Sequence, residues 1–506
     1  MEQYKKQTRD AIAMITEDST ESARNHLLHY LSQHPDDLES LYGLAIAYTQ
    51  MDNPDSAMYY VEQALSHGLP FSRFLAGPRD LLGDLYSFNS FIEMAEQLGM
   101  ELLHGPMLGQ VTDSSASFWV RTVHATPIKV VVLDEEDNEY YSNEENTDSQ
   151  KDFTATVSVN GLIANQHYRY QLIINDKRQA EIYSFRSFPK TGKPALFGVG
   201  FGGGAGYTPS YERVWTTIDS HKPLAFLLLG DNVYIDHPLL KPVQQYCYYR
   251  RQSRPEFRSF AASSSIYAIW DDHDFTTNDS FGGPAIDDPP WKREVWHTFK
   301  NNWINPYYGG GEEEPGCWFN MSIADVDFIL LDGRYYRMNP EAEHAVAPSM
   351  LGETQKKWLF EQLKNSKATF KIICSPVPVA DGAKPGSLDT WEGFKEEREE
   401  IFSFIEKNTI EGVIFLSADR HRSDAWKINR ENAYDFYEFQ SSKLSNIHTH
   451  KIIPEALFGY NDKCSFGMID FNTLIDDPTI SFSIFSIDNE LIHKITVKKS
   501  QLTFKK

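Results

Sequence analysis

The sequence predicts an α/β fold for the larger, C-terminal part of the chain, preceded by a segment of β-strands and a segment of α-helices. Short apolar runs that alternate with helical stretches predict the α/β part, and three of these runs end in polar clusters. A change from helical spacing to period-two alternation near residue 105 separates the two preceding segments. We therefore expect a helical segment over residues 1–100, a β-sandwich over 104–190 and an α/β domain over 194–506.

The helical segment carries an internal repeat. From about residue 7 to residue 95 the apolar residues follow helical spacing, and Ala23 and Leu27 recur as Ala57 and Val61 at an offset of 34 residues. This resembles a pair of tetratricopeptide-like repeats, for which a groove that binds a protein partner is one use and a helical cap on the rest of the chain is another. Because a stable solenoid usually needs about three repeats, we favour the cap.

The middle segment reads as β-structure. Four runs alternate apolar and polar residues, namely ASFWVRT, IKVVVL, FTATVSV and HYRYQLII. Several short strands at such spacing predict a β-sandwich. Leu162 followed by Tyr168 and Tyr170 resembles the corner tyrosine of immunoglobulin-like and fibronectin-like sandwiches. No pattern in this segment points to chemistry, so we predict a structural role for it.

The C-terminal part alternates strands with helices. The apolar runs are LFGVG, AFLLL, YAIW, FILL, FKIIC and VIFL, and the stretches Gln355 to Ser366 and Trp391 to Lys407 have helical spacing. This alternation predicts a layered α/β core. Ligands of such folds gather at the carboxyl ends of the strands, so we expect the functional site there.

Three polar clusters stand at the ends of apolar runs: GDNVYID, DDHD and ADRHRSD. A group of buried carboxylates without compensating charge is costly, and a polyvalent cation would supply that charge. The clusters therefore predict a metal site. Their members are Asp231, Tyr234, Asp271, Asp272, His273, Asp274, Asp419 and His421.

Each cluster suggests particular roles. Asp231 follows Gly230, which allows a sharp turn, and its carboxylate is a hard donor able to bridge two cations. Tyr234 is either a phenolate ligand or a packed aromatic with a hydrogen-bonded hydroxyl. His421 stands two residues after Asp419, and in an extended backbone both side chains point to one side and can face one metal.

The DDHD cluster pairs an oxygen ligand, Asp272, with a group able to transfer protons, His273. Asp271 and Asp274 are candidates for helix N-cap or surface positions. Basic residues stand close to the acidic clusters, where they either orient a phosphoryl oxygen or neutralise the acids, and both roles stay open. They are Lys292, Arg293, Arg334, Arg337, Arg420 and Arg422.

Composition limits the partners. The 506 residues carry a formal charge of −23, which argues against a nucleic-acid backbone or an anionic membrane as partner but leaves room for a small phosphate ester in a locally positive pocket. The N-terminus has no apolar leader, and no stretch approaches the roughly 18 consecutive apolar residues of a membrane span. We expect a soluble, cytoplasmic protein.

The motifs also carry a family resemblance. GDNVYID, IWDDHDFTTND, FILLDGRYYR and LSADRHRSD resemble, in order, the signatures of the PhoD-like metallophosphatases, a family of alkaline phosphatases and phosphodiesterases, and HGPMLGQVTDSSASFWVRT resembles their preceding β-domain. The resemblance covers about residues 104–480. It implies a metallophosphatase-like layered α/β sandwich that hydrolyses phosphate monoesters or diesters with a metal-activated oxygen nucleophile.

The resemblance also implies roles for single residues. His273 would act as an acid or phosphate contact, and Arg422 with Asn278 would contact the phosphoryl oxygens. Calcium, manganese or zinc would be the metals, with iron as a further candidate, because the family uses iron with calcium. The implied metal ligands are Asp231, Tyr234, Asp272, Asp419 and His421.

One departure from the family pattern concerns Gly200. Family members carry a cysteine ligand after the first strand of the catalytic domain, and Gly200 stands where that thiolate is expected. Loss of a thiolate predicts a preference for divalent ions over iron. It also supports an alternative function, a catalytically degraded phosphatase-like protein that binds a ligand and presents the helical segment to a partner.

Overall fold

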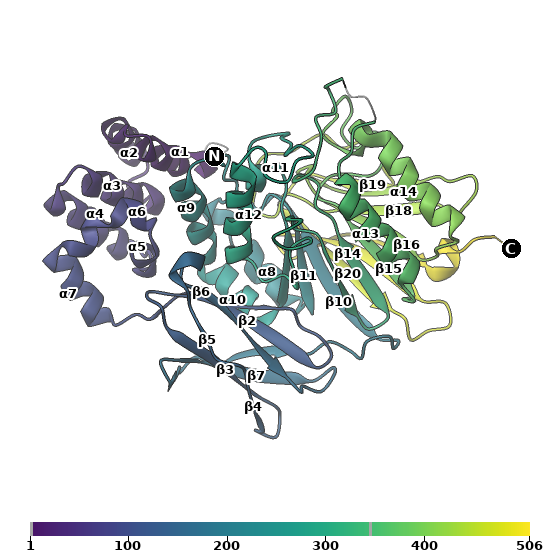
Figure 1. The fold of residues 1–506 in the computed structure, drawn as a ribbon, viewed down its shortest axis with the longest axis horizontal. Helices are drawn as coiled ribbons and strands as arrows, with labels where there is room; N and C mark the ends of the chain where they lie inside the picture. The colour runs from purple at the N-terminus through teal and green to yellow at the C-terminus, as the bar shows by residue number, and fades with distance from the viewer. Residues whose placement is uncertain (1–3, 344–346, 506) are drawn as a thin grey trace.

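The computed structural model describes residues 4–343 and 347–505. Figure 1 shows the helical segment at one end of the molecule, the first β-structure below it, and two large sheets with their helices at the other end. The order along the chain is the predicted one: helices, then strands, then alternating strands and helices. The boundaries of the three expected domains stay a prediction.

The N-terminal segment consists of helices with short connections. The starts of α1 and α3 differ by 34 residues, as do those of α2 and α4. Asp37 accepts a hydrogen bond from the Ser40 amide and caps α3, and Asn53 caps α4 through the Ser56 amide. The tetratricopeptide assignment stays a prediction. The helices are α1 (Tyr4–Thr16), α2 (Thr20–Gln33), α3 (Leu38–Gln50), α4 (Pro54–Ser66), α5 (Ser72–Ala76), α6 (Arg79–Leu82) and α7 (Asn89–Leu98).

This segment packs on the rest of the chain, as a cap would. α1 contacts α9 (Lys241–Gln252), and the two lie side by side in Figure 1. The buried Arg73 of α5 forms two hydrogen bonds with the buried Glu39 of α3, at 2.8 and 2.9 Å. Tyr246 of α9 donates a hydrogen bond to the same carboxylate at 2.9 Å. A buried polar network therefore joins the helical segment to the α/β part.

The first β-structure consists of two antiparallel sheets. The corner arrangement expected at Tyr168 is present, because its hydroxyl accepts a hydrogen bond from the Ile163 amide at 2.7 Å. The fibronectin-like assignment itself stays a prediction. One sheet contains β1 (Leu102–Gly109), β2 (Ser115–Thr122) and β6 (Thr154–Asn160); the other contains β3 (Pro127–Leu133), β4 (Glu139–Tyr141), β5 (Glu145–Asn146), β7 (His167–Ile174), β8 (Lys177–Arg178) and β9 (Tyr183–Arg186).

The α/β part has a six-stranded and a seven-stranded sheet. All six predicted apolar runs are strands of these sheets. The first, in spatial order, is β12 (Ser265–Ile269), β11 (Ala225–Leu229), β10 (Leu196–Gly202), β20 (Ser465–Asn472), β21 (Thr479–Ser486) and β22 (Leu491–Lys498). The second is β13 (Phe319–Ile323), β14 (Val326–Leu330), β15 (Phe370–Cys374), β16 (Val413–Ser417), β18 (Phe436–Gln440), β17 (Ser423–Ile428) and β19 (Phe458–Tyr460).

The two sheets pack face to face, and helices cover their outer faces. Phe439 of β18 stacks on Phe482 of β21 with ring centroids 4.6 Å apart, which places the core between the sheets. Phe226 of β11 packs against Phe260 on the helical side of the six-stranded sheet. The helices are α8 (Val214–Ser220), α10 (Pro255–Ser263), α11 (Asp272–Phe275), α12 (Trp291–Asn302), α13 (Gly352–Asn365) and α14 (Lys395–Lys407).

β10, β11 and β12 run parallel to one another, as do β14, β15, β16 and β18. Strands such as AFLLL of β11 are buried along their whole length, which is why they read as uninterrupted apolar runs. Among the residues that the structure describes, no helix has the length and apolar character needed to cross a membrane.

Candidate functional site

The loops after β11, β12 and β16 bring the three polar clusters together. β11 and β12 are parallel neighbours in the six-stranded sheet, whereas β16 belongs to the seven-stranded sheet. The site therefore lies where the carboxyl ends of strands from both sheets meet. A pocket of about 360 Å³ there is lined by Lys6, Asp231, Asp272, His273, Asn278, Asp279, Lys384, Asp419, Arg420, His421, His448 and His450.

The loop after β11 turns sharply at Gly230, as predicted. Its φ of 103° is in the region that favours glycine, and a Cβ there would lie 2.5 Å from the Cβ of Asp271. Asp231, Tyr234 and Asp236 also have positive φ, of 55°, 53° and 58°. Because such conformations are costly for residues with a side chain, surrounding contacts must hold this loop in place.

Asp274 joins the first two clusters. One of its carboxylate oxygens accepts hydrogen bonds from the amides of Asn232 and Val233, at 2.8 and 3.0 Å. Asp271 is the N-cap residue of α11, as expected, and Asp274 completes a capping box with it. Asp274 is buried and fixes the loop after β11 against the loop after β12.

The side chains of Asp231, Asp272 and His273 converge. One ligand atom from each lies within 4.8 Å of the other two. Oδ1 of Asp231 is buried without a hydrogen-bond partner, so a donor oxygen stands ready inside the site. The two carboxylates are hard donors that suit divalent cations, and the imidazole of His273 lies beside them, so these residues fit the metal that the sequence predicts.

The carboxylates of this cluster repel one another, and the nearby His273 only partly offsets their charge. Burial, together with the carboxylates of Asp272 and Asp271, raises the pKa of Asp231 well above its usual range, although His273 opposes the shift. Burial disfavours a charged imidazole, but the carboxylates of Asp272, Asp231 and Asp236 raise the pKa of His273 to about 10. A bound cation would relieve the repulsion between the carboxylates.

The hydroxyl of Tyr234 is hydrogen-bonded. The ring is fully buried, and the hydroxyl accepts from Nδ2 of Asn446 at 2.7 Å. Burial and the carboxylate of Asp231 raise the pKa of Tyr234 well above its usual range. This geometry matches the packed aromatic with a satisfied hydroxyl, and the role of Tyr234 as a ligand stays a proposal.

Asp419 and His421 both line the pocket, as expected, but the local geometry differs from the prediction. Their φ angles are 65° and 48°, so the backbone is a left-handed turn and not an extended strand. Beside His421 stand His448 and His450, with ring centroids 5.1 and 5.6 Å from it. These two histidines were missed, although their His-Thr-His spacing was a readable signal for a pair of ligands.

The two arginines of the ADRHR motif have different roles. Arg420 lines the pocket. Arg422, expected to contact phosphoryl oxygens, is instead buried outside the pocket lining and donates to Asp424 at 2.6 Å and to the Ala383 carbonyl at 2.7 Å. Its charge is paired with Asp424, and its role as a phosphoryl contact stays a proposal.

Asn278 is exposed and lines the pocket. Lys384, on the loop after β15, lines the same pocket, and the sequence did not single it out. Its ammonium group lies 3.0 Å from Asp279 Oδ1, 3.1 Å from Asp389 Oδ2 and 3.8 Å from Asp419 Oδ2. Lys384 therefore brings a positive charge close to the metal-ligand candidates.

Arg334 and Arg337 neutralise acids, one of the two roles left open for them. Both are buried; Arg334 donates to Asp271 at 2.6 Å and to Asp389 at 2.7 Å, and Arg337 donates to Asp389 at 2.9 Å. Lys292 is also buried and donates to backbone carbonyls.

Gly200 does not stand at the site. A Cβ at position 200 would lie 2.5 Å from the ring of Phe226 and 3.3 Å from the sulfur of Met468, inside the core of the six-stranded sheet. The glycine at the strand ends is Gly203, whose Cβ would lie 2.6 Å from Cβ of Ala418 and 2.9 Å from the Gly230 carbonyl. Placing the family's thiolate at Gly200 was therefore wrong.

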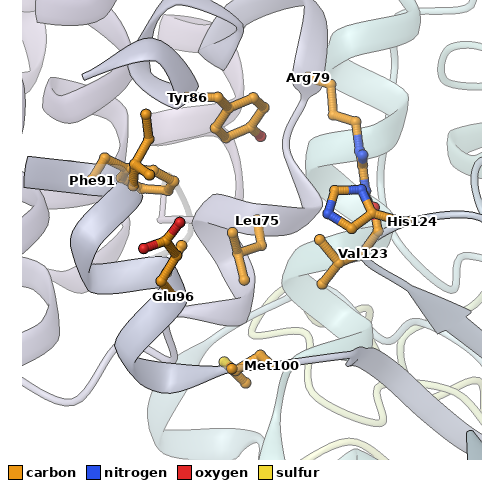
Figure 2. Close-up of a pocket in the computed structure, with 11 residues that line it drawn as sticks. Leu75, Arg79, Tyr86, Phe91, Glu96, Met100, Val123 and His124 are labelled. Carbon is orange, nitrogen blue, oxygen red and sulfur yellow. Dashed lines mark hydrogen bonds between the residues drawn. The ribbon is translucent and has the colours of Figure 1, made fainter. Parts of the chain in front are cut away.

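A second cavity, of about 320 Å³, lies between the helical segment and the first β-structure. Apolar side chains such as Leu75 and Val123 line it, with Arg79 and His124 on one side and Glu96 on the other (Figure 2). None of the candidate metal-binding groups found among the described residues lies there. The chemistry is therefore expected at the strand ends.

Comparisons with known proteins agree with this geometry. The family model for PhoD-like phosphatases matches residues 198–453, and a domain of unknown function (DUF7800) matches residues 99–191. Alkaline phosphatase D of Bacillus subtilis (strain 168) is 29% identical over 135 residues. That match covers 24% of this chain and 22% of the relative.

Two solved structures share the fold. A structure of PhoD aligns with a TM-score of 0.65 at 16% identity, covering 79% of this chain and 90% of that one. A purple acid phosphatase from yellow lupin (Lupinus luteus) seeds aligns with a TM-score of 0.58 at 12% identity, covering 78% of this chain and 75% of that one. At these identities the likeness concerns the fold alone, which is mixed α/β as the sequence predicts.

Proposed function

The chain belongs to the PhoD-like phosphatase family, and from this premise we propose that it hydrolyses phosphate monoesters or diesters with the help of bound metal ions. The observation that carries the proposal is the convergence of Asp231, Asp272 and His273, with a buried carboxylate oxygen that lacks a hydrogen-bond partner. Asp419 and His421 from the other sheet extend this donor set across the pocket.

The donor set favours divalent cations, with calcium, manganese and zinc as the proposed metals and iron as a further candidate. Asp231, Asp272, Asp419 and His421 would hold them, with Tyr234 as an additional ligand. When bound, the metal would activate the attacking oxygen and offset charge on the phosphoryl group.

The remaining side chains would bind and protonate the substrate. Nδ1 of His273 is engaged by Asp236 at 2.5 Å, so Nε2 is the nitrogen that can give a proton to the leaving oxygen. Arg420 and Lys384 line the same pocket and can orient phosphoryl oxygens. Asn278, at the exposed rim, is proposed as a further contact.

The alternative, a degraded phosphatase-like binding protein, rests on the missing family cysteine, and no cysteine is among the described residues that line the pocket. The donor set at the strand ends favours the enzyme.

The test compares Asp231→Asn and His421→Ala with the unmodified protein in a screen of phosphate monoesters and diesters with added metals. We expect turnover to fall at least about 100-fold in each variant, because both side chains are proposed ligands, with little change in thermal unfolding. Asp476→Asn, an exposed position away from the pocket, is the control. Near-full activity in both site variants, after trace metals are removed, would refute the proposal.

A further inference from the structure

Arg9 of the N-terminal helix α1 reaches the loop after β11, 225 residues further along the chain. Its side chain is only 4% exposed. The guanidinium donates a hydrogen bond to the Tyr234 carbonyl at 3.1 Å and forms an ion pair with Oδ2 of Asp236. A buried charge from the helical segment therefore stands directly behind the proposed active site.

Asp236 links Arg9 to His273. Its Oδ2 is held by Arg9, while its Oδ1 pairs with Nδ1 of His273 at 2.5 Å. With one carboxylate oxygen held by the guanidinium, the other has a fixed direction, and the imidazole ring is held with it. A carboxylate that engages Nδ1 also fixes the orientation of the imidazole ring and leaves Nε2 to face the reacting groups.

The same guanidinium contacts both ends of a strained turn. Tyr234 and Asp236 have φ angles of 53° and 58°, a conformation that is unfavourable for residues with a side chain. Arg9 binds the carbonyl of the first and the carboxylate of the second. These contacts offset the cost of the conformation and hold the turn in its place beside the pocket.

α1 itself is placed firmly. It packs against α9 and α3, and Asp10 forms a second ion pair with Arg9 at 2.9 Å. Lys6, three residues before Arg9 and so on the same helix face, lines the pocket with Asp231 and Asp419. Helix α1 thus places two positively charged side chains beside the site, the buried Arg9 and the exposed Lys6.

We propose that Arg9 is a positioning residue of the active site, which acts through Asp236 to fix the orientation of His273. The inference rests on the proposed function for its catalytic meaning, but the position of His273 can be measured without any turnover. It makes the N-terminal helical segment a part of the active site and not a separable module.

The test uses the full chain with the variants Arg9→Ala, Arg9→Lys, Asp236→Asn and the double variant of Arg9→Ala with Asp236→Asn. Removing a group that orients a site residue typically costs about 10- to 100-fold in activity, and we expect a loss of that size in kcat with a smaller change in KM. The losses in the double variant should not add, because both changes break one relay. Added guanidinium ion should restore part of the activity of Arg9→Ala.

The control is Arg24→Ala, which removes an arginine of the same helical segment that pairs with Glu21 on the surface. A readout independent of turnover is the resonance of the Nδ1 proton of His273 in histidine-labelled protein. We expect this signal to shift or exchange faster in Arg9→Ala and Asp236→Asn and to stay unchanged in Arg24→Ala. Arg9→Lys keeps the charge and should retain more activity than Arg9→Ala, and Asp236→Asn tests the same contact if Arg9→Ala does not fold.

Two results would overturn the proposal. One is an Arg9→Ala protein, or an Asp236→Asn protein if Arg9→Ala does not fold, that keeps kcat within about twofold and leaves the His273 resonance unchanged. The other is a fully additive loss in the double variant, because independent effects would exclude a relay. If the unmodified protein hydrolyses no phosphate ester, the proposed function fails, while the His273 resonance still decides the role of Arg9.

Discussion

Left-handed backbone conformations recur in the loops that form the candidate site. Asp231, Tyr234, Asp236, Asp419 and His421 all have φ between 48° and 65°. Such residues persist only where their surroundings hold them, and here buried hydrogen bonds and ion pairs from neighbouring loops and from α1 do so. The turns aim side chains from strand ends of both sheets at one pocket, which extended loops would not do.

The structure changes the expected effect of a cysteine at position 200. Family resemblance implies that Gly200→Cys would restore a thiolate ligand and raise iron retention. Because the new Cβ would meet Phe226 at 2.5 Å, we expect the substitution to destabilise the protein by about 1–3 kcal/mol. Urea unfolding measures the loss, and iron content with visible absorption should show no gain over the unmodified protein.

Gly83→Ala is the matched control, because Gly83 has a helical φ of −53° and its nearest neighbour to a new Cβ is 3.5 Å away. A Gly200→Cys protein that binds stoichiometric iron would show instead that position 200 does reach the site.

Among the elements, the junction between the helical segment and α9 includes the buried ion pair of Glu39 with Arg73, to which Tyr246 of α9 donates a hydrogen bond. Burial opposes ionisation of Glu39, but the guanidinium of Arg73 outweighs it and lowers the pKa of Glu39. A carboxylate with a lowered folded pKa stabilises the fold above its unfolded pKa, near 4.5, and this stabilisation is lost as pH falls through the folded value.

Glu39→Gln should therefore lower the free energy of unfolding at pH 7 by about 3–5 kcal/mol, because it leaves Arg73 buried without a counter-charge. The difference from the unmodified protein should shrink as pH falls below about 4.5. Urea unfolding at several pH values measures both effects. Glu21→Gln, on the exposed pair with Arg24, should change stability by less than about 0.5 kcal/mol. An equal loss in the two variants would contradict this account.

At the scale of the whole molecule, the helical segment and the α/β part depend on each other. The absence of catalytic clusters before residue 100 predicts that a chain beginning near Leu103 keeps its activity. The structure gives the opposite expectation, because Arg9 and Lys6 border the site and Glu39 pairs with α9.

We therefore expect the truncated chain to lose at least about 10-fold in specific activity, or to become insoluble, since α9 would expose its buried polar groups. Activity per folded molecule, with folding checked by circular dichroism, measures this. A soluble truncated protein with full activity would show that the helical segment is dispensable.

The sequence by itself determined the class of the fold and the three polar clusters that the fold brings together. Uninterrupted apolar runs such as AFLLL predict strands, because strands that are buried on both faces consist mainly of apolar residues. The carboxylates directly after these runs mark the strand ends. The clusters around Asp231, Asp272 and Asp419 and the family resemblance were therefore readable from local patterns.

Only the tertiary structure decided which residues join those clusters from elsewhere. Lys384, His448 and His450 come from other loops, and Arg9 lies more than two hundred residues from its partner Asp236. The tertiary structure also decided where side chains of one motif lie. Arg420 lines the pocket, whereas Arg422 pairs with Asp424. The physical reason is that local spacing fixes strands and helices, whereas contacts between distant segments depend on how the two sheets and the helical segment pack together.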